Sequence, residues 1–262
     1  MSAVVLEQGL IHYETMGRGN EPLIFLHGWL GSWRYWVPAM EELSFSRRVY
    51  ALDLWGFGDS DRLSDYTVAG YVDLLESFLN EMGIQRADLV GHALGGLVAL
   101  RFAARSPNRV ERVMGVSVPL VGGSIEPVFG ELSANGELLA QLIARGANFP
   151  EVEREARKVD IHAVVSSVRS VVQSDGLRDM LLPFDLSVLL VHGASDPLVQ
   201  VPRREWLGGF GQNTRVVLLE GVHHFPMLEE RNKFNRLVME FIDGGKELGS
   251  LEPKAEWRRR PR

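Results

Sequence analysis

The sequence predicts an α/β fold in which a mostly parallel central sheet is flanked by helices. Short apolar runs alternate with longer amphipathic stretches, which is the pattern of strands alternating with helices. Several apolar runs are nearly continuous in Val, Leu and Ile and end at Gly or Asp, as expected of strands buried on both faces. The 262 residues, 45% of them apolar, are enough for one domain with a large core.

Seven segments have the character of strands. They are rich in apolar and β-branched residues, and most are bounded by Gly, Pro or Asp. The predicted strands are residues 9–15, 22–26, 49–52, 87–90, 110–118, 188–191 and 215–219.

Three helices are predicted between and after these strands, over residues 67–82, 94–105 and 231–241. The second is followed by Ser-Pro-Asn and the third by Gly-Gly at 244–245. These residues end helices because proline and glycine continue the hydrogen-bond ladder poorly.

One interval breaks the alternation of strands and helices. Residues 119–186 contain helical patterns, such as 136–145 and 159–172, and no convincing strand. We therefore expect a helical cap over the carboxyl edge of the sheet, where open α/β sheets bind ligands. The core then comprises residues 1–118 and 187–243, and residues 244–262 form a flexible basic tail.

The charge balance disfavours nucleic acid as a partner. The chain has 28 basic and 34 acidic residues, a net charge of −6. The tail alone carries six basic and three acidic residues, so residues 1–243 carry a net charge of −9. Phosphate binding needs a concentrated basic surface, which such a body does not provide.

Composition also limits compartment and cofactors. The chain has no cysteine, which excludes disulfides, a Cys-ligated metal and a thiolate nucleophile. No apolar run is long enough to cross a membrane, and the first residues lack the features of a signal peptide, so we expect a soluble cytoplasmic protein. No phosphate-binding glycine motif or metal-ligand spacing is present, and we predict neither cofactor nor metal.

The most informative stretch is Gly91-His92-Ala93-Leu94-Gly95, which joins a buried strand to an apolar helix. Glycines flank the turn because side chains there would clash with the neighbouring strand and helix, while the central residue takes a strained backbone conformation.

This stretch resembles the nucleophile elbow, Gly-x-Ser-x-Gly, of the α/β-hydrolase superfamily, with Ala93 in the serine's place. Residues 27–29, His-Gly-Trp, are similar to the family's oxyanion loop, and residues 53–60 to its Asp-x-x-Gly-x-Gly-x-Ser scaffold turn. The resemblance extends over nearly all of residues 4–243. It implies an α/β-hydrolase fold whose oxyanion hole is formed by the backbone N–H groups of Trp29 and Leu94.

The resemblance also implies an acid and a base. Residues 193–199 are similar to the family's Gly-x-x-Asp-x-x-Val segment, which makes Asp196 the acid that orients the catalytic histidine. Residues 221–226 align His224 with the base, and the adjacent His223 is the alternative. The order of Ala93, Asp196 and His224 is the nucleophile, acid and base order of this fold.

Ala93 leaves three explanations open, because without a hydroxyl no acyl-enzyme can form there. The first is an esterase-like hydrolase whose catalytic triad was inactivated by a Ser→Ala change. The second is a natural enzyme in which His224 and Asp196 activate water, as in the aminoacrylate hydrolases, whose elbow can read as Gly91–Gly95 does here. The third is a ligand-binding pseudoenzyme. Ser32 and Ser60 are not expected to face His224.

The substrate expected from these residues is a small or medium carboxylic ester or related apolar acyl compound. Aromatic and aliphatic residues near the elbow, the cap and the acid loop are expected to line its pocket. The predicted pocket residues are Trp29, His92, Phe129, Met180, Phe184, Leu198 and Val199. We expect no membrane partner, and the sequence does not specify an oligomeric state.

Overall fold

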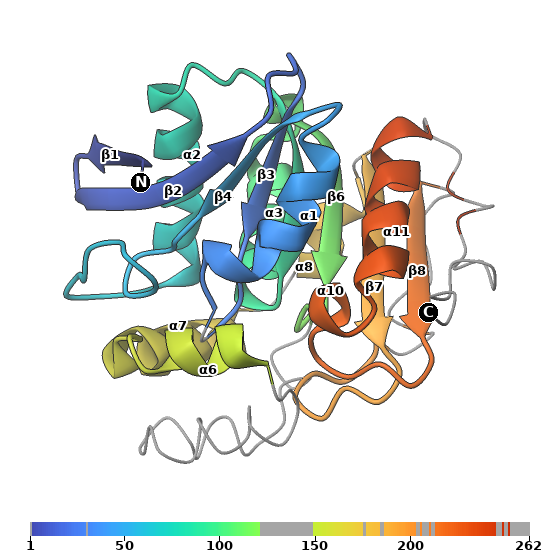
Figure 1. Cartoon of the computed structure of the whole chain (residues 1–262). Helices are drawn as coiled ribbons and strands as arrows, with labels where there is room; N and C mark the ends of the chain where they lie inside the picture. Colours follow the sequence, from blue (N-terminus) through green and yellow to red (C-terminus); the bar gives the residue numbers. More distant parts are fainter. Residues whose placement is uncertain are drawn as a thin grey trace.

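A computed structural model of the chain describes residues 2–29, 31–120, 149–174, 177–183, 186–202, 205, 210, 213–244, 248 and 251. Its centre is an eight-stranded sheet with the order β1-β2-β4-β3-β5-β6-β7-β8 (Figure 1). The strands are β1 Ser2–Leu6, β2 Gly9–Met16, β3 Pro22–Leu26, β4 Arg48–Leu52, β5 Ala87–His92, β6 Val110–Val116, β7 Ser187–Gly193 and β8 Thr214–Leu219. Pairing is antiparallel among β1, β2 and β4 and parallel from β4 to β8.

The predicted fold class is confirmed, and each predicted strand is present with shifts of at most a few residues at its ends. Every residue of β5 and of β7 is buried, as the apolar runs predicted. The sequence prediction missed β1, an edge strand whose residues alternate between partly buried and exposed, with Val5 75% exposed. Such a strand gives a weak apolar signal because only one of its faces is covered.

Helices cover both faces of the sheet. Figure 1 shows α1 and α11 on one face, and α2, α3 and α8 on the other. Predicted helices 67–82, 94–105 and 231–241 correspond to α2, α3 and α11. The helices are η1 Trp33–Trp36, α1 Val37–Leu43, α2 Val68–Glu81, α3 Leu94–Arg105, η2 Pro107–Arg109, α6 Pro150–Ala156, α7 Ile161–Gln173, α8 Leu177–Leu181, α10 Pro226–Glu229 and α11 Arg231–Asp243.

Part of the predicted cap region crosses the carboxyl ends of the strands. Figure 1 shows α6 and α7 at the edge toward which the strand arrows of β3 and β6 point. The indole N–H of Trp29 donates to Ser167 Oγ of α7 at 2.9 Å, and the amide of Asp160 donates to the carbonyl of Gly56 at 2.9 Å. The short helix α8 differs from the expectation because it packs on α3. The predicted helix 136–145 lies outside the described residues.

The prediction of a flexible tail from residue 244 is wrong for two positions. Leu248 and Leu251 are 2% and 6% exposed and belong to the hydrophobic core, so these two side chains are packed. The Arg-rich end lies outside the described residues.

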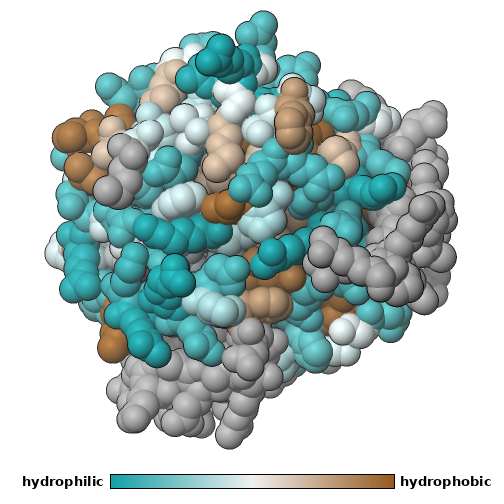
Figure 2. All heavy atoms as spheres, viewed as in Figure 1, coloured by the Kyte–Doolittle hydropathy of each residue, from teal (hydrophilic) through white to brown (hydrophobic). Residues whose placement is uncertain are grey.

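The surface in Figure 2 is mainly hydrophilic, with hydrophobic residues in small separate patches. Among the described residues, no helix has the length and apolar character that a membrane span needs.

Candidate active site

The turn between β5 and α3 has the geometry expected of a nucleophile elbow. Ala93 has φ 46° and ψ −110°, a conformation that costs a non-glycine residue about 1–3 kcal/mol. Its amide donates to the carbonyl of Val116 on β6 at 2.8 Å, and its carbonyl accepts from Leu97 at 3.0 Å. A Cβ at Gly91 would lie 2.3 Å from the carbonyl oxygen of Gly95, so the turn closes only with glycine there. The elbow therefore retains its strained form with alanine at its centre.

The predicted oxyanion loop lies against the elbow. A Cβ at Gly28 would lie 2.8 Å from the Cβ of Ala93, and the amide of Gly95 donates to the carbonyl of His27 at 3.1 Å. Leu94 is the first residue of α3, at the positive end of the helix dipole. The structure thus brings Trp29, which follows Gly28, and Leu94 to the same end of the sheet as Ala93.

Asp196 and His224 form a buried acid–base pair. The Oδ2 atom of Asp196 lies 2.9 Å from His224 Nδ1, and the two side chains are 1% and 5% exposed. Oδ1 accepts the amides of Leu198 and Val199 at 2.8 and 3.1 Å. Burial opposes the charge of Asp196, but His224 and these amides outweigh burial and lower the pKa of the carboxyl to about 2. The ionised acid accepts the Nδ1 proton, which leaves the lone pair of His224 on Nε2.

The structure distinguishes the two adjacent histidines. His223 is exposed, and its Nδ1 atom lies 3.0 Å from Oε2 of Glu229, which also accepts the backbone amide of His223. The other oxygen of Glu229 accepts the amide of Phe225 at 3.0 Å. Glu229 therefore holds the backbone on both sides of His224. Of the two histidines, His224 is the one that contacts Asp196.

The predicted pocket residues differ in where they lie. Trp29, Leu198 and Val199 are buried beside the loops just described. Met180 is 37% exposed, and its sulfur lies 3.4 Å from Arg101 Nη1, two helical turns along α3 from the elbow, so it is not brought to the site. Phe129 and Phe184 lie outside the described residues.

His92 was also predicted to line the pocket. Its ring is fully buried, with Nε2 2.9 Å from the carbonyl oxygen of His224 and Nδ1 3.1 Å from Tyr35 Oη. Tyr35 was not singled out from the sequence, because its neighbours do not indicate a partner 57 residues away. The aromatic residues around it in the sequence indicated a packed segment but did not identify His92 as its partner.

Ser117 is a second residue that sequence reasoning missed. It follows β6, has φ 48°, is fully buried and donates its amide to the carbonyl of Val191 at 2.8 Å. Among the described residues, Ser117 and Ala93 are the only non-glycine residues with positive φ, and Ser117 Oγ has no hydrogen-bond partner. The sequence showed only an extended apolar run at this point.

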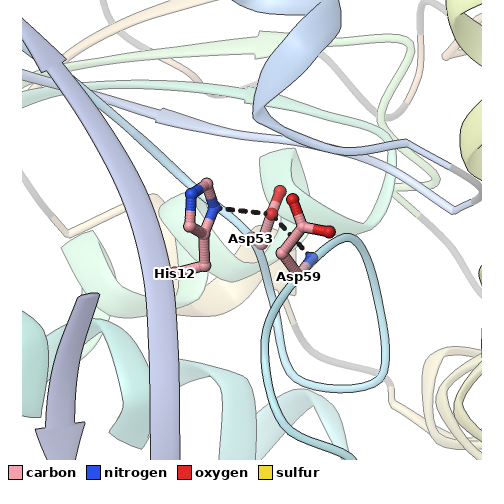
Figure 3. Close-up of side chains that lie close together, drawn as sticks. All are labelled: His12, Asp53 and Asp59. Atoms are coloured by element: carbon pink, nitrogen blue, oxygen red, sulfur yellow. Dashed lines mark hydrogen bonds and ion pairs between the residues drawn. The ribbon is translucent and has the colours of Figure 1, made fainter. Parts of the chain in front are cut away.

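Asp53, from the predicted scaffold turn, is the centre of a cluster with His12 and Asp59, in which His12 and Asp53 are buried and Asp59 is exposed (Figure 3). Oδ2 of Asp53 lies 2.9 Å from His12 Nδ1 and accepts the amide of Asp59, and Oδ1 accepts the amide of Trp33. The hydrogen bond to Asp53 is the main cause that raises the pKa of His12. The ligand atoms of this group lie close enough together to suggest a metal site, but both oxygens of Asp53 already accept protein donors.

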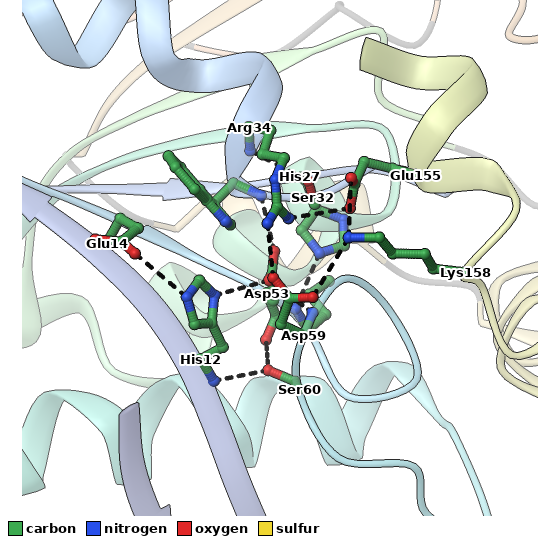
Figure 4. Close-up of polar contacts among 12 residues, drawn as sticks. His12, Glu14, His27, Ser32, Arg34, Asp53, Asp59, Ser60, Glu155 and Lys158 are labelled. Carbon is green, nitrogen blue, oxygen red and sulfur yellow. Dashed lines mark hydrogen bonds and ion pairs between the residues drawn. The ribbon is translucent and has the colours of Figure 1, made fainter. Parts of the chain in front are cut away.

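Two further side chains, both positively charged, extend the cluster and connect it to the cap region (Figure 4). Arg34 lies 2.8 Å from Asp59 and 3.3 Å from Glu155 of α6, and Lys158 contacts the same two carboxylates at 3.4 and 3.3 Å. Glu155 is 2% exposed, so its charge is neutralised by these neighbours rather than by water. We interpret the cluster as structural: it fixes the scaffold turn and joins it to α6.

The two serines near the oxyanion loop and scaffold turn are both engaged elsewhere. Ser32 Oγ accepts the amide of Arg34 at the start of η1. Ser60 Oγ donates to the carbonyl of Asp53 at 2.7 Å and accepts the amide of His12. Neither hydroxyl is directed to His224 by these bonds.

This fold and site geometry define a class of protein. The sequence model of the alpha/beta hydrolase fold family matches residues 21–164, which is more than half of the chain. The protein therefore belongs to the α/β-hydrolase family.

Individual relatives place it among hydrolases. It is 28% identical over 247 residues to 2-hydroxymuconate semialdehyde hydrolase of Pseudomonas sp. strain CF600, covering 84% of this chain and 86% of that protein. It is 25% identical to the pimeloyl-[acyl-carrier protein] methyl ester esterase of Neisseria meningitidis, covering 88% and 96%. Its fold matches the crystal structure of the enol-lactonase from Burkholderia xenovorans LB400, with a TM-score of 0.82 and 20% identity over 92% of this chain and all of that one.

Proposed function

We propose that this protein is a hydrolase of carboxylic esters or related small apolar acyl compounds, in which Ala93 replaces the nucleophilic serine. The observation that carries the proposal is the Asp196–His224 hydrogen bond of 2.9 Å at the same edge of the sheet as a strained elbow. The similarity to a methyl ester esterase supports this class of substrate, and the similarity to a semialdehyde hydrolase supports hydrolysis as the reaction.

Each residue has a defined role in the proposed reaction. A serine hydroxyl at position 93 would lose its proton to Nε2 of His224 while its oxygen attacks the acyl carbon. Asp196 keeps the ring in the tautomer that leaves Nε2 basic. The amides of Trp29 and Leu94 stabilise the oxyanion of the tetrahedral intermediate. The intermediate collapses by breaking the bond to the alcohol, which leaves with the proton held on His224 Nε2. Water, deprotonated by His224, then attacks the acyl-enzyme and releases the carboxylic acid and the serine.

With alanine at position 93 the covalent step is absent. In a protease that uses the same serine–histidine–aspartate mechanism, loss of the nucleophilic serine lowers kcat by a factor of about 10⁶. The remaining groups bind an acyl compound and polarise its carbonyl.

A second mechanism is also consistent with the intact pair. Because Asp196 and His224 remain hydrogen-bonded without any group from position 93, His224 Nε2 can deprotonate a water molecule that attacks the bound acyl group directly. This gives the same net hydrolysis without an acyl-enzyme.

The variant Ala93→Ser tests the proposal. We expect kcat/KM for short p-nitrophenyl esters to rise by about 10³ or more, and a fluorophosphonate to label the protein at position 93. The double variant Ala93→Ser/His224→Ala is the control and should be unlabelled. A folded Ala93→Ser protein that neither labels nor turns over esters contradicts the proposal.

The chain with Ala93 provides the test of the second mechanism. If His224 activates water, His224→Ala abolishes whatever turnover the parent has. Turnover that survives this change argues against the non-covalent mechanism. Acyl binding with no turnover in the parent or in Ala93→Ser indicates a ligand-binding protein.

A further inference from the structure

The ring of His92, the residue before Ala93 in the elbow, lies between the oxyanion loop and the segment that contains His224. Its Nε2 atom is 2.9 Å from the backbone carbonyl oxygen of His224, and its Nδ1 atom is 3.1 Å from the hydroxyl of Tyr35. The same hydroxyl accepts the backbone amide of Gly28 in the oxyanion loop. His92 and Tyr35 are 0% and 2% exposed, so these hydrogen bonds are shielded from water.

The direction of every bond in this chain of contacts is determined by the groups at its ends. The carbonyl of His224 can only accept, so Nε2 of His92 must carry the proton. Burial is the main cause that lowers the pKa of His92 well below its usual value, so the ring is neutral and Nδ1 has a lone pair. Tyr35 therefore donates its hydroxyl proton to Nδ1, and its oxygen accepts from Gly28.

We propose that Tyr35 and His92 are positioning residues that connect the oxyanion loop to the backbone of the catalytic base through one ordered hydrogen-bond chain. This inference rests on the proposed function of the site. Its chain of bonds includes no atom of the side chain at position 93.

Steric contacts indicate that the two segments are positioned against each other. A Cβ at Gly28 would lie 2.7 Å from Nδ1 of His92 and 2.8 Å from the Cβ of Ala93. The ring centroids of His92 and His224 are 4.6 Å apart, and the ring of Phe225 packs 5.1 Å from both. Small displacements of either segment are thus transmitted to the elbow.

The chain also decides which amide is available to the substrate. Because Tyr35 takes the amide of Gly28, that N–H points into the protein and does not face an acyl oxygen. The oxyanion donor proposed for this loop is instead the amide of the next residue, Trp29. Removal of the Tyr35 hydroxyl leaves the Gly28 amide without this acceptor, so the loop amide that binds the oxyanion is less well defined.

The first experiment uses the chain with Ala93 and needs no activity. We expect imidazole ¹⁵N spectra to show His92 neutral, with its proton on Nε2, from pH 5 to 8. In Tyr35→Phe the Nδ1 resonance should move toward that of an unbonded nitrogen, and the Gly28 amide should exchange faster. A proton on Nδ1, or a His92 resonance unaffected by Tyr35→Phe, overturns the proposal.

The second experiment measures kinetics in the Ala93→Ser background. Because the chain positions groups for the transition state, Tyr35→Phe should lower kcat about tenfold and change KM less than about twofold. His92→Leu should lower kcat about a hundredfold. His92→Gln, whose side-chain oxygen and nitrogen can replace Nδ1 and Nε2–H, should restore kcat to within about fivefold.

Tyr71→Phe is the control, because the hydroxyl of Tyr71 is buried like that of Tyr35 but donates to the carbonyl of Trp55 at 3.0 Å, outside the proposed chain. It should leave kcat unchanged. Equal losses in Tyr71→Phe and Tyr35→Phe, or no rescue by His92→Gln, overturn the positioning role. An inactive Ala93→Ser protein instead contradicts the proposed function, and the spectra still decide the direction of the chain.

Discussion

The two ends of the sheet each bury a carboxylate, and they shift its pKa in opposite directions. At the carboxyl end, Asp196 has a pKa lowered to about 2. At the amino end, burial raises the pKa of Asp88 to about 6, although Arg112 and Arg47 act to lower it. Both side chains are at most 3% exposed, so burial alone does not explain the difference.

The donors around each carboxylate do explain it. Asp196 accepts two backbone amides and the ring of His224, all between 2.8 and 3.1 Å. Among the described residues, the carboxylate of Asp88 has arginine partners alone, Arg47 at 3.2 Å and Arg112 at 3.3 Å, and a further carboxylate, Glu111, raises its pKa. Short bonds from a fixed loop thus stabilise a negative charge better than longer bonds from two arginines, of which Arg47 is shared with Glu21 and Asp243.

The surroundings of Asp88 show how the amino end is held together. Arg47 is 7% exposed and connects Asp88 to Glu21 before β3 and to Asp243 at the end of α11. These residues border a polar hollow of about 370 Å³. We interpret this end as a structural junction of strands and helix, in contrast to the catalytic role proposed for the carboxyl end.

The largest expected effect separates the two ends by activity. In the Ala93→Ser background, Asp196→Asn should lower kcat by about 10⁴, because the amide no longer holds the His224 tautomer that leaves Nε2 basic. Asp88→Asn, the same chemical change at the other end, should alter kcat less than about twofold. Steady-state kinetics on a p-nitrophenyl ester measures both. Comparable losses in the two variants contradict the division of roles.

The next effect concerns stability. Arg47→Met should lower the free energy of unfolding by about 3–5 kcal/mol, because it leaves Asp88 buried without one of its cations. Arg86→Met is the matched control, since the ion pair of Arg86 with Glu111 is about half exposed and should contribute less than about 1 kcal/mol. Urea unfolding at pH 7 compares the variants. If Arg47→Met and Arg86→Met lower the free energy of unfolding equally, Arg47 does not stabilise the amino end in the way proposed.

Much of the carboxyl end could be predicted from sequence, because its signals are local. The elbow glycines, the strand before them and the acid loop are contiguous motifs, and residues 22–26 and 94–105 have the predicted bounds. The assignment of His224 rather than His223 came from the family pattern. The structure pairs His224 with Asp196 and His223 with Glu229, a contact that the sequence pattern did not indicate.

The amino end could not be predicted in the same way. Arg47 and Asp243 are 196 residues apart and carry no motif, so only the folded arrangement of β4 and α11 brings them together. The role of His92 was hidden for the same reason, since its partners lie on η1 and on the loop before α10. Local patterns predict strands, helices and turns, whereas pairings between distant polar residues depend on the register and packing of the elements.

The smallest expected effect is a difference in pH dependence. Because the pKa of Asp88 is raised from 3.8 to about 6, the folded state binds more protons than the unfolded state between these values, and stability falls as pH rises from about 4 to 6. The full change in the free energy of unfolding is about 3 kcal/mol, and Asp88→Asn should remove it.

The pH dependence due to Asp196 has the opposite sign. Its contribution to the free energy of unfolding is present above about pH 4 and is lost, by about 2 kcal/mol, as pH falls toward 2. Urea midpoints for the parent and both asparagine variants from pH 2.5 to 7 resolve the two windows. If Asp88→Asn leaves the slope between pH 4 and 6 unchanged, then Arg47 and Arg112 keep Asp88 ionised, and the two ends of the sheet do not differ as inferred.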